Sequence, residues 1–577
     1  MHINVDLSYP RPLCRRKSFI DLNGEWDFYL EDYDVGEKLP RYKSFPKNHL
    51  KINVPFCYQS ELSGINISTR YDTVWYHRQV KFNCKDNQRV ILHIGACDYK
   101  TSVYVNSILV GTHLGGYTAF NFDITHALIN NVADIVIRVD DSYDVHQPRG
   151  KQKWRNENFG CWYQEVTGIW KPVWAEIVED TYIKSVKLTP NENSLIEAEL
   201  NLNKTYSGKL VVEVMFDNRV VCSETFEIDG VNIFLNIPLT ELHFWSIEEP
   251  NCYIVRFKLP NGEQIETLFG YRFINTSNGQ ILLNGKPIFM RLTLEQGYYK
   301  EGIYTFKDET QMIDEIRLIR DSGFNGLRLH QKVEDERFYY LCDILGLIVW
   351  SEMPSCYDFD ATTKINVKRE WTEIINEHYN HPSILVWTPL NESWGVPAIR
   401  VDEEQQDFAV ELYNLTKSID KTRLVVSNDG WEHCKTDLVT LHNYLQEPER
   451  FKSEFIDVLM DIIKENRPLY KDQIYVPFAS KFKYEGQPIL IDEFCGIGFN
   501  IDQVDNGWGY GDKVDSINAF LQRYDGLVKL ATTCPLLSGW CMTQISDVYQ
   551  EVNGLFTFNR RSKFPIEELY KINTQKR

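Results

Sequence analysis

The stretch SILVWTPLNESWG (383–395) decides the fold of this chain. It sets an apolar, strand-like run directly against a polar pair, Asn391 and Glu392. A short apolar run rich in branched and aromatic residues is typical of a buried strand. In a barrel of parallel strands the interior is packed apolar, and the residues that carry chemistry follow the C-terminal strand ends. The stretch therefore predicts a barrel strand with a carboxylate at its mouth.

Strand-like and helix-like segments alternate from about residue 274 to residue 577. Eight strand-like runs occur there, namely IFMRL (288–292), FNGLRLH (324–330), LIVWSEM (347–353), SILVWTPL (383–390), LVVSN (424–428), LVTLH (438–442), PILIDEF (488–494) and LLSGWCMTQ (536–544). Helical patterns are predicted near 308–323, 334–346, 402–418, 450–464 and 514–531. This count and alternation predict an eight-stranded (β/α)8 TIM barrel over 274–577.

The chain before this barrel predicts two β domains. From 1 to 180, short alternating runs such as ADIVIRVDD and KPVWAEIV are separated by turn residues, a pattern typical of a β-sandwich. The interval 181–273 continues with SLIEAELNL and YIVRFKL, and it has the length of one immunoglobulin-like sandwich. The predicted fold class is multidomain, with two β-sandwiches followed by an α/β barrel.

Composition and charge narrow the class of partner. The formal net charge is -19, from 62 Lys and Arg against 81 Asp and Glu, which argues against nucleic acid and anionic membrane surfaces. No apolar run is long enough to cross a bilayer. The chain has 14 Trp and 32 Tyr, whose rings stack on the apolar faces of sugars. A neutral carbohydrate is therefore the expected partner.

The cysteines predict a reducing compartment. All 13 are scattered singly without a CxxC pair, which is typical of buried thiols rather than a disulfide framework. The N-terminal MHINVDLSYPRPLCRRKSF has no apolar core behind a basic start. Both observations predict a cytoplasmic protein, or a periplasmic one if a signal segment has been removed.

Two carboxylates stand at strand ends of the predicted barrel, Glu392 after the fourth strand and Glu493 at the end of the seventh. Hydrolysis of an acetal needs one carboxyl group to protonate the leaving oxygen and a second to face the anomeric carbon. The alternative interpretation is a pair of salt bridges at the barrel rim. The neighbours favour catalysis, because Asn391 is placed to bind a sugar hydroxyl and Arg328 to keep Glu493 ionised.

The whole chain resembles glycoside hydrolase family 2, which includes β-galactosidases, β-glucuronidases and β-mannosidases. FIDLNGEWDFYL (19–30), WYHRQVKF (75–82) and GIWKPVWAEI (168–177) are similar to the family's sugar-binding jelly-roll domain. LLNGKPIFMR (282–291) is similar to the entry of its catalytic barrel. The resemblance implies a jelly-roll domain over 1–180, an immunoglobulin-like domain over 181–273 and the catalytic barrel over 274–577.

The resemblance also implies a site. NESW is similar to the family's acid/base motif and IDEFCG to its nucleophile motif, which implies Glu392 as general acid/base and Glu493 as nucleophile of a retaining exo-β-glycosidase. Substrate-binding roles are implied for Asn391, Arg328, Tyr444 and Trp540. No metal or other cofactor is needed for this chemistry, although some family β-galactosidases bind ions near the site. A homo-oligomer is compatible with the resemblance, since dimers and tetramers are common in the family.

Departures from the family pattern fall on positions expected to choose the sugar. Gln331, Lys332 and Val333 stand where the family usually has His-Tyr-Pro. Glucuronidases carry an Asn-x-Lys that grips the sugar carboxylate, whereas the matching stretch here is EVNGLF, whose Glu551 would repel a uronic acid. The residues expected to choose the sugar are Glu295, Gln296, His330, Lys332 and Glu551.

The sequence therefore predicts hydrolysis of terminal neutral sugars, most simply a β-galactosidase-like activity. A β-galactofuranosidase or α-L-arabinofuranosidase of the same family is the alternative, and a non-catalytic carbohydrate-binding protein is the alternative of another class. His442 has no second His or Cys at ligand spacing, which predicts a structural histidine. Trp508 and Tyr510 are expected to be sugar platforms near the mouth of the site.

Overall fold

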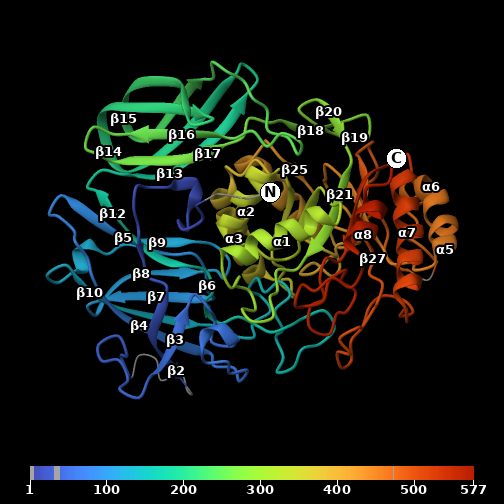
Figure 1. Ribbon diagram of the computed structural model, residues 1–577, viewed down its shortest axis with the longest axis horizontal. Coiled ribbons are helices and arrows are strands. Elements are labelled where there is room, and N and C mark those ends of the chain that lie inside the picture. Colours follow the sequence, from blue (N-terminus) through green and yellow to red (C-terminus); the bar gives the residue numbers. More distant parts are fainter. Residues whose placement is uncertain (1–5, 32–38, 472) are drawn as a thin grey trace.

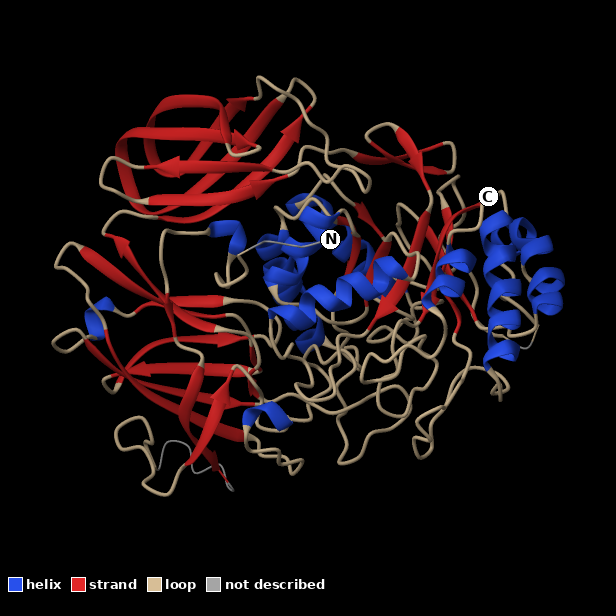
Figure 2. Ribbon diagram, viewed as in Figure 1, coloured by secondary structure: helices blue, strands red, loops and turns tan. Residues whose placement is uncertain are grey.

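The computed structural model describes residues 6–31, 39–471 and 473–577. Figure 1 shows two β-rich units on one side of the molecule and a barrel on the other. Figure 2 shows that most of the helices gather around this barrel. None of the helices in these ranges is both long enough and apolar enough to cross a bilayer.

Two antiparallel sheets form the first unit. The first sheet has the strand order β1 (Ile20–Asp21), β12 (Val173–Glu179), β5 (Gln88–Ile94), β9 (Phe120–Asp123). The second sheet has the order β3 (Leu50–Val54), β2 (Gly24–Glu31), β4 (Thr73–Lys81), β10 (Val132–Asp140), β7 (Lys100–Val105), β8 (Ile108–Leu114). A ribbon of β6 (Cys97–Asp98) and β11 (Gly168–Ile169) accompanies them. Alternation buries one face of each strand, and both sheets share one cluster that includes Trp26, Ile135 and Leu92. The jelly-roll assignment stays a prediction.

A second unit contains five antiparallel strands. They are β13 (Ile183–Asn191), β14 (Leu195–Phe216), β15 (Arg219–Pro238), β16 (Tyr253–Lys258) and β17 (Gln264–Phe269). Asp217 and Asn218 turn the hairpin between β14 and β15 with φ of 49° and 61°, the left-handed geometry that two-residue hairpin turns need. Leu200 and Val212, from the two halves of β14, share one apolar cluster. All five strands belong to one hydrogen-bonded sheet, and the immunoglobulin-like assignment stays a prediction.

Eight parallel strands form the barrel, as predicted. They are β21 (Met290–Glu295), β22 (Gly326–Leu329), β23 (Ile348–Glu352), β24 (Ile384–Thr388), β25 (Leu424–Val425), β26 (Val439–Asn443), β27 (Ile489–Cys495) and β28 (Leu537–Thr543). Met290, Trp350 and Leu490 lie in the cluster that fills the interior. A small sheet of β18 (Ile274–Ser277), β19 (Gln280–Leu283) and β20 (Lys286–Ile288) leads into the barrel.

The predicted helices are confirmed with two differences. Four occur where expected, α1 (Glu309–Asp321), α2 (Glu336–Leu345), α4 (Glu403–Ile419) and α7 (Ile517–Thr533). The helix predicted over 450–464 is divided into α5 (Pro448–Glu454), η5 (Ile456–Val458) and α6 (Leu459–Glu465). The helices α3 (Ala361–His378) and α8 (Ile566–Asn573) were not predicted. Other short 3-10 helices are η1 (Pro12–Cys14), η3 (Glu61–Ser63) and η4 (Thr125–Ala127).

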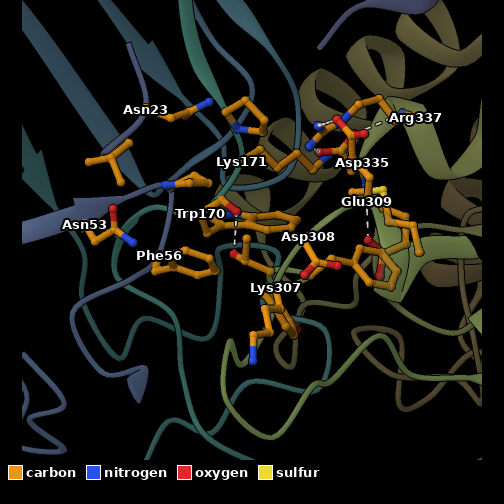
Figure 3. Close-up of a pocket in the computed structure, with 18 of the residues that line it drawn as sticks. Asn23, Asn53, Phe56, Trp170, Lys171, Lys307, Asp308, Glu309, Asp335 and Arg337 are labelled. Atoms are coloured by element: carbon orange, nitrogen blue, oxygen red, sulfur yellow. Dashed lines mark hydrogen bonds and ion pairs between the residues drawn. The ribbon is translucent and has the colours of Figure 1, made fainter. Parts of the chain in front are cut away.

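The first unit packs directly against the barrel. Glu370 of α3 accepts hydrogen bonds from the backbone N–H groups of Gly116 and Tyr117, at 2.8 and 2.9 Å. A cavity of about 520 Å³ lies at this junction, between Trp170 and Lys171 on one side and Asp308 and Arg337 on the other (Figure 3). The residues that line this cavity come from the first unit and from the α1 and α2 side of the barrel, and they include neither Glu392 nor Glu493.

Candidate active site

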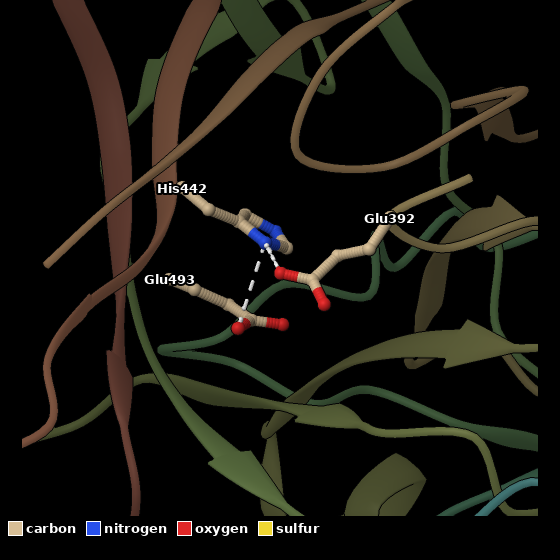
Figure 4. A group of neighbouring side chains, drawn as sticks. All are labelled: Glu392, His442 and Glu493. Carbon is tan, nitrogen blue, oxygen red and sulfur yellow. Dashed lines mark hydrogen bonds and ion pairs between the residues drawn. The ribbon is translucent and has the colours of Figure 1, made fainter. Parts of the chain in front are cut away.

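The C-terminal ends of β24 and β27 bring Glu392 and Glu493 together. Oxygen atoms of the two carboxylates and a ring nitrogen of His442 all lie within 4.8 Å of one another. Figure 4 shows the three side chains converging from separate segments. The side chain of Glu392 is 18% exposed, whereas that of Glu493 is 6% exposed. One carboxylate is therefore open to the cleft and the other lies deeper in the barrel mouth.

A tight turn after β24 aims Glu392 at this point. Glu392 and Ser393 both have left-handed backbones, with φ of 51° and 58°. Non-glycine residues adopt this region at some cost in energy, so the surrounding contacts must hold it. The N–H of Glu392 donates to the carbonyl of Asp429 at 2.9 Å, and the N–H of Ser393 to Asn428 Oδ1 at 3.0 Å.

Cations and hydroxyls surround Glu493. Arg328 donates to Glu493 Oε1 at 2.7 Å, and the Tyr444 hydroxyl donates to Oε2. His330 Nδ1 lies 4.0 Å from Oε1. Burial alone would raise the pKa of Glu493, but the charges of His442, Arg328 and His330 and the Tyr444 hydrogen bond lower it well below its usual range. Glu493 is therefore held as a carboxylate.

His442 connects the two carboxylates. Its Nδ1 lies 2.8 Å from Glu392 Oε1 and 3.5 Å from Glu493 Oε2, and its Nε2 lies 3.4 Å from Asp492 Oδ1. Burial would lower the pKa of His442, but the charges of Glu493 and Asp492 and the hydrogen bond to Glu392 raise it well above its usual value. The prediction of a structural histidine was wrong about its setting. Its place near the C-terminal end of β26 was the signal that could have found it.

Arg328 fixes the orientation of Asn391. It donates to Asn391 Oδ1 at 2.7 Å and lies 2.9 Å from Asp429 Oδ2, and it also contacts Glu352. With its carbonyl oxygen occupied, Asn391 presents a buried Nδ2 that has no hydrogen-bond partner among the described residues. A buried amide left in this state is poised to donate to a bound ligand.

A second pair of acids lies below His442. Asp429 and Asp492 are fully buried, and their carboxylates face His442 within the same cluster. Burial, together with the charge of Asp492, raises the pKa of Asp429 to about 7, against the lowering effect of Arg328. Asp429 is therefore protonated over part of the neutral range.

The same side chains include two groups that could hold a metal ion, Glu392 with His442 and Glu493, and Asp429 with His442 and Asp492. Both groups depend on His442, and a metal needs a neutral imidazole. The raised pKa of His442 keeps its ring protonated, so it acts as a hydrogen-bond donor. A metal ion at either group would have to displace the proton of His442.

Aromatic side chains line the mouth beside Glu392. Trp394 Nε1 donates to Glu392 Oε2 at 3.4 Å. Trp394 contacts Trp162 and Tyr357 edge to face, with ring centroids 5.2 and 5.5 Å apart, and Tyr357 stacks on Trp154. Trp154 and Trp162 come from the first unit. The first unit therefore supplies part of the wall of the site.

The wall beside Glu493 carries three residues named from the sequence, Tyr444, Trp508 and Tyr510. Tyr444 contacts Thr543 Oγ1 at 3.2 Å and stacks on Tyr510 with ring centroids 3.4 Å apart. Trp508 meets Tyr510 edge to face at 5.5 Å. Tyr510 therefore lies against Tyr444, which donates to Glu493, and the roles of Trp508 and Tyr510 as sugar platforms stay predictions.

Glu551 is the centre of a hydrogen-bonded group next to this wall. Its oxygens accept hydrogen bonds from the Tyr163 hydroxyl, from Gln296 Nε2 at 3.2 Å and from Asn553 Nδ2 at 3.0 Å. Gln296 also donates to Gln544 Oε1 at 2.6 Å, and Gln544 follows β28. Gln296 and Glu551 therefore meet, and their role in choosing the sugar stays a prediction.

Two residues expected to choose the sugar lie elsewhere. Glu295 points outward from β21 toward Glu315 of α1 and Arg560, and burial with the charge of Glu315 raises its pKa to about 8. Lys332 donates to the carbonyls of Gly297 and Tyr304 at 2.6 and 2.8 Å and to Glu334. Both side chains are buried against these partners and away from the two catalytic candidates, which contradicts the specificity roles predicted for Glu295 and Lys332.

Trp540 also lies outside the site. Alternate residues of a barrel strand face opposite sides, and Cys541 of β28 lies in the interior cluster. Trp540 therefore faces the helix layer, where its Nε1 donates to Thr532 of α7 at 3.0 Å. The prediction that Trp540 lines the sugar subsite was wrong, because a motif does not show which face of a strand a residue occupies.

Comparison with known proteins identifies the family to which this barrel is similar. Residues 274–473 match the family model described as glycosyl hydrolases family 2, TIM barrel domain. A putative β-glucuronidase of Formosa agariphila is 31% identical over 437 residues, which are 72% of this chain and 51% of that protein. The chain belongs to glycoside hydrolase family 2.

Other family 2 proteins differ in their named activities. A β-galactosidase of Thermoanaerobacter pseudethanolicus is 27% identical over 70% of this chain and 55% of its own length. The chain thus spans about half the length of these two curated relatives. A solved β-glucuronidase of Bifidobacterium dentium, complexed with coumarin-3-O-glucuronide, superposes with a TM-score of 0.80 at 18% identity, covering 97% of this chain and 98% of that one. This likeness shows a shared fold.

Proposed function

We propose that this protein is a retaining exo-β-glycosidase that removes terminal neutral sugars from oligosaccharides or polysaccharides, with a β-galactosidase-like preference. The approach of the Glu392 and Glu493 carboxylates to within 4.8 Å carries the proposal. Retaining glycosidases hold their two carboxyl groups roughly 5 to 5.5 Å apart, whereas inverting enzymes leave space for a water molecule between them. The separation here supports double displacement.

In the first step Glu493 attacks the anomeric carbon while Glu392 gives its proton to the leaving oxygen. Arg328 and Tyr444 keep Glu493 ionised and oriented before attack. The glycosyl ester that forms has no negative charge on Glu493. Its loss removes the largest effect that raises the pKa of His442 against burial. The pKa of His442 therefore falls in the intermediate, while Glu392, now a carboxylate, takes the proton of the incoming water as its oxygen bonds to the anomeric carbon and Glu493 leaves as a carboxylate.

Asn391 and His330 are proposed to bind the sugar beside the reacting carbon. The free Nδ2 of Asn391 is available to the hydroxyl next to the anomeric carbon, because Arg328 already occupies its Oδ1. His330 is fixed by Glu352, 2.9 Å from its Nδ1, and faces Glu493. A hydrogen bond that strengthens as the ring flattens stabilises the transition state over the ground state.

The preference for a neutral sugar rests on Glu551. We assign its carboxylate, which accepts from Gln296 and Asn553, to the specificity wall, the side of the site proposed to choose the sugar. There it would meet the carboxylate of a uronic acid with like charge. A second candidate function is a β-uronidase, favoured by the relatives named as β-glucuronidases. Galactofuranosides and arabinofuranosides are further neutral candidates.

We also propose the division into a jelly-roll domain over 1–180, an immunoglobulin-like domain over 181–273 and a catalytic barrel over 274–577. The sheets of the first two units and the eight-stranded barrel support these bounds. Glu392 and Glu493 both belong to the third interval.

A panel of nitrophenyl glycosides tests the function, with β-galactopyranoside, β-galactofuranoside, α-L-arabinofuranoside, β-glucuronide and β-mannoside as arms. Glu493→Gln should lose activity on every arm by about 10⁴-fold or more, because the nucleophile is gone. Glu392→Ala should lose less on a dinitrophenyl glycoside, whose leaving group needs no proton, and azide should restore turnover with release of a glycosyl azide.

The outcomes separate the candidates. Preference for the glucuronide would replace the neutral-sugar assignment by the β-uronidase. If wild type turns over none of these substrates yet binds the sugars, the non-catalytic carbohydrate-binding alternative holds instead. Equal losses in Glu392→Ala on good and poor leaving groups would contradict its role as the acid.

A further inference from the structure

Lys151 is a buried lysine whose ammonium group is not satisfied. It is 6% exposed, and its one hydrogen-bond partner among the described residues is Cys161 Sγ at 3.4 Å. No carboxylate oxygen of these residues forms an ion pair with it within 4.0 Å. An ammonium offers three donors, and a thiol is a weak acceptor. At least two donors of a buried charge are therefore left without an acceptor.

Other buried lysines of this chain show what a structural role looks like. Lys332 donates to the carbonyls of Gly297 and Tyr304 and to Glu334. Lys563 donates to the carbonyls of Phe499 and Val552 and to Asp547, at 2.8, 3.2 and 2.7 Å. Each has three oxygen partners, as a buried charge requires. Lys151 has fewer oxygen partners than these two, and so has Lys171, whose Nζ donates to the carbonyl of Tyr117 at 2.9 Å and lies 4.9 Å from the centroid of the Trp170 ring. Lys151 differs from all three in having no oxygen partner among the described residues.

The position of Lys151 is fixed by the barrel. The N–H groups of Arg149 and Gly150 donate to the carbonyl of Ser355 at 2.9 and 3.1 Å, and the Tyr357 hydroxyl donates to the carbonyl of Gly150. Ser355 and Tyr357 follow β23, whose end carries Glu352. The backbone that bears Lys151 is therefore held at the catalytic mouth of the barrel although it belongs to the first unit.

Two carboxylates of the site face Lys151. Burial alone would lower the pKa of Lys151, but the charges of Cys161, Tyr357, Glu392 and Glu551 raise it, so the group stays positive. Glu392 is the proposed acid and Glu551 stands in the specificity wall. Neither carboxylate forms an ion pair with the ammonium, so the unused donors of Lys151 are available to a polar group of a ligand.

We propose that Lys151 is a sugar-binding residue of the catalytic site, supplied by the first unit, which donates hydrogen bonds to hydroxyl oxygens of a neutral sugar. The inference rests on the proposed function. A hydroxyl fits better than a carboxylate, because the surroundings of Lys151 already contain two carboxylates for one ammonium. Glu551 then accepts from a neighbouring hydroxyl, so that a vicinal pair is held between a donor and an acceptor.

The test replaces Lys151 by Met, which keeps the length and volume of the side chain but removes the charge. With nitrophenyl β-galactoside or whichever neutral glycoside wild type hydrolyses, Lys151→Met should lower kcat/KM about 10- to 100-fold, the loss expected for a hydrogen bond from a charged donor. Its melting temperature should equal or exceed that of wild type, because an unsatisfied buried charge has been removed. The contrasting variant Lys332→Met should melt at lower temperature.

Ligand binding gives a readout that does not need turnover. Galactose or arabinose should raise the melting temperature of wild type and not that of Lys151→Met. Unchanged kcat/KM together with unchanged sugar binding in Lys151→Met would overturn the inference and leave the glycosidase assignment intact. It would also be overturned if wild type preferred the glucuronide and Lys151→Met lost only that activity. If wild type hydrolyses nothing and no sugar shifts its melting temperature, both proposals fail.

Discussion

At the scale of single residues, the site depends on how the buried acids share the charges of Arg328 and His442 and the proton of Asp429. Glu392 and Glu493 were predicted from strand-end positions, and the structure brings them together with Asn391, Arg328 and Tyr444. Their partner His442 has no motif of its own. Its role depends on distances to segments 50 residues away along the chain, which no local pattern records.

Replacing His442 by Gln tests this arrangement. Burial alone would raise the pKa of Glu493, and the charge of His442 is the largest of the effects that lower it. Without that charge the pKa of Glu493 should rise, so the acid limb of the profile of kcat/KM against pH should move to higher pH. We also expect kcat/KM at its optimum to fall about 100-fold, in the range of general acid and base effects.

The Gln variant keeps an amide that can donate to Glu392, which separates the effect of charge from that of the hydrogen bond. A fall in rate with an unmoved acid limb would mean that His442 acts by position alone. Tyr444→Phe is the companion variant, because the Tyr444 hydrogen bond also lowers the pKa of Glu493. It should move the same limb in the same direction.

At the scale of elements, α3 shows why a helix was missed. Its outer face packs on the first unit, so polar residues such as Glu370 and His378 are buried together with Trp371 and Ile375. The usual contrast between an apolar face and a solvated face is therefore absent from its sequence. Asp360 caps the helix by accepting from the N–H of Thr363 at 2.8 Å, and this was the remaining local signal.

Glu370 makes the stability of the junction between α3 and the first unit depend on pH. Burial, with the charge of Glu373, raises its pKa to about 8, against the lowering effect of the Gly116 and Tyr117 N–H groups. An unfolded Glu titrates near ~4.3, so the folded protein binds the extra proton between about pH 4 and 8. The contribution of Glu370 to stability is thus complete at low pH and lost as pH rises through this window.

The variant Glu370→Gln should remove this dependence. Its stability relative to wild type should increase between pH 5 and pH 8 by ~1–3 kcal/mol, seen as a smaller drop in melting temperature over that range. Glu404→Gln, on an exposed ion pair with Lys364, is the control and should follow wild type at both pH values. Parallel curves for wild type and Glu370→Gln would contradict the assignment.

At the scale of the whole molecule, the site is assembled from two units. The barrel supplies the carboxylates, and the segment 149–163 of the first unit adds Lys151, Trp154 and Trp162 to the mouth. Gly150 permits the approach. Its φ is +58°, and a Cβ at this position would lie 2.3 Å from the carbonyl oxygen of Gln331. No larger residue fits there without moving the segment away from the barrel.

Gly150→Ala should therefore lower both stability and activity. We expect a loss of about 1–3 kcal/mol from backbone strain and overpacking, and a fall in kcat/KM beyond what that stability loss explains, because the wall beside Glu392 shifts. Gly64→Ala is the matched control, since Gly64 has a φ of +79° and nothing within 4 Å of a Cβ. It should lose stability but keep its kcat/KM. Equal activity in the two variants would count against a role for the first unit in the site.

The sequence by itself determined the barrel, its eight strands and the two catalytic candidates, because strand periodicity and strand-end polarity are local properties of the chain. Only the tertiary structure decided which strand-end residues face the cleft. It turned Trp540 and Glu295 toward the helix layer, tied Lys332 to nearby carbonyls, and brought His442 and Lys151 to the carboxylates. The direction of a side chain and the approach of distant loops depend on packing between elements, and the spacing of residues along the chain does not specify that packing.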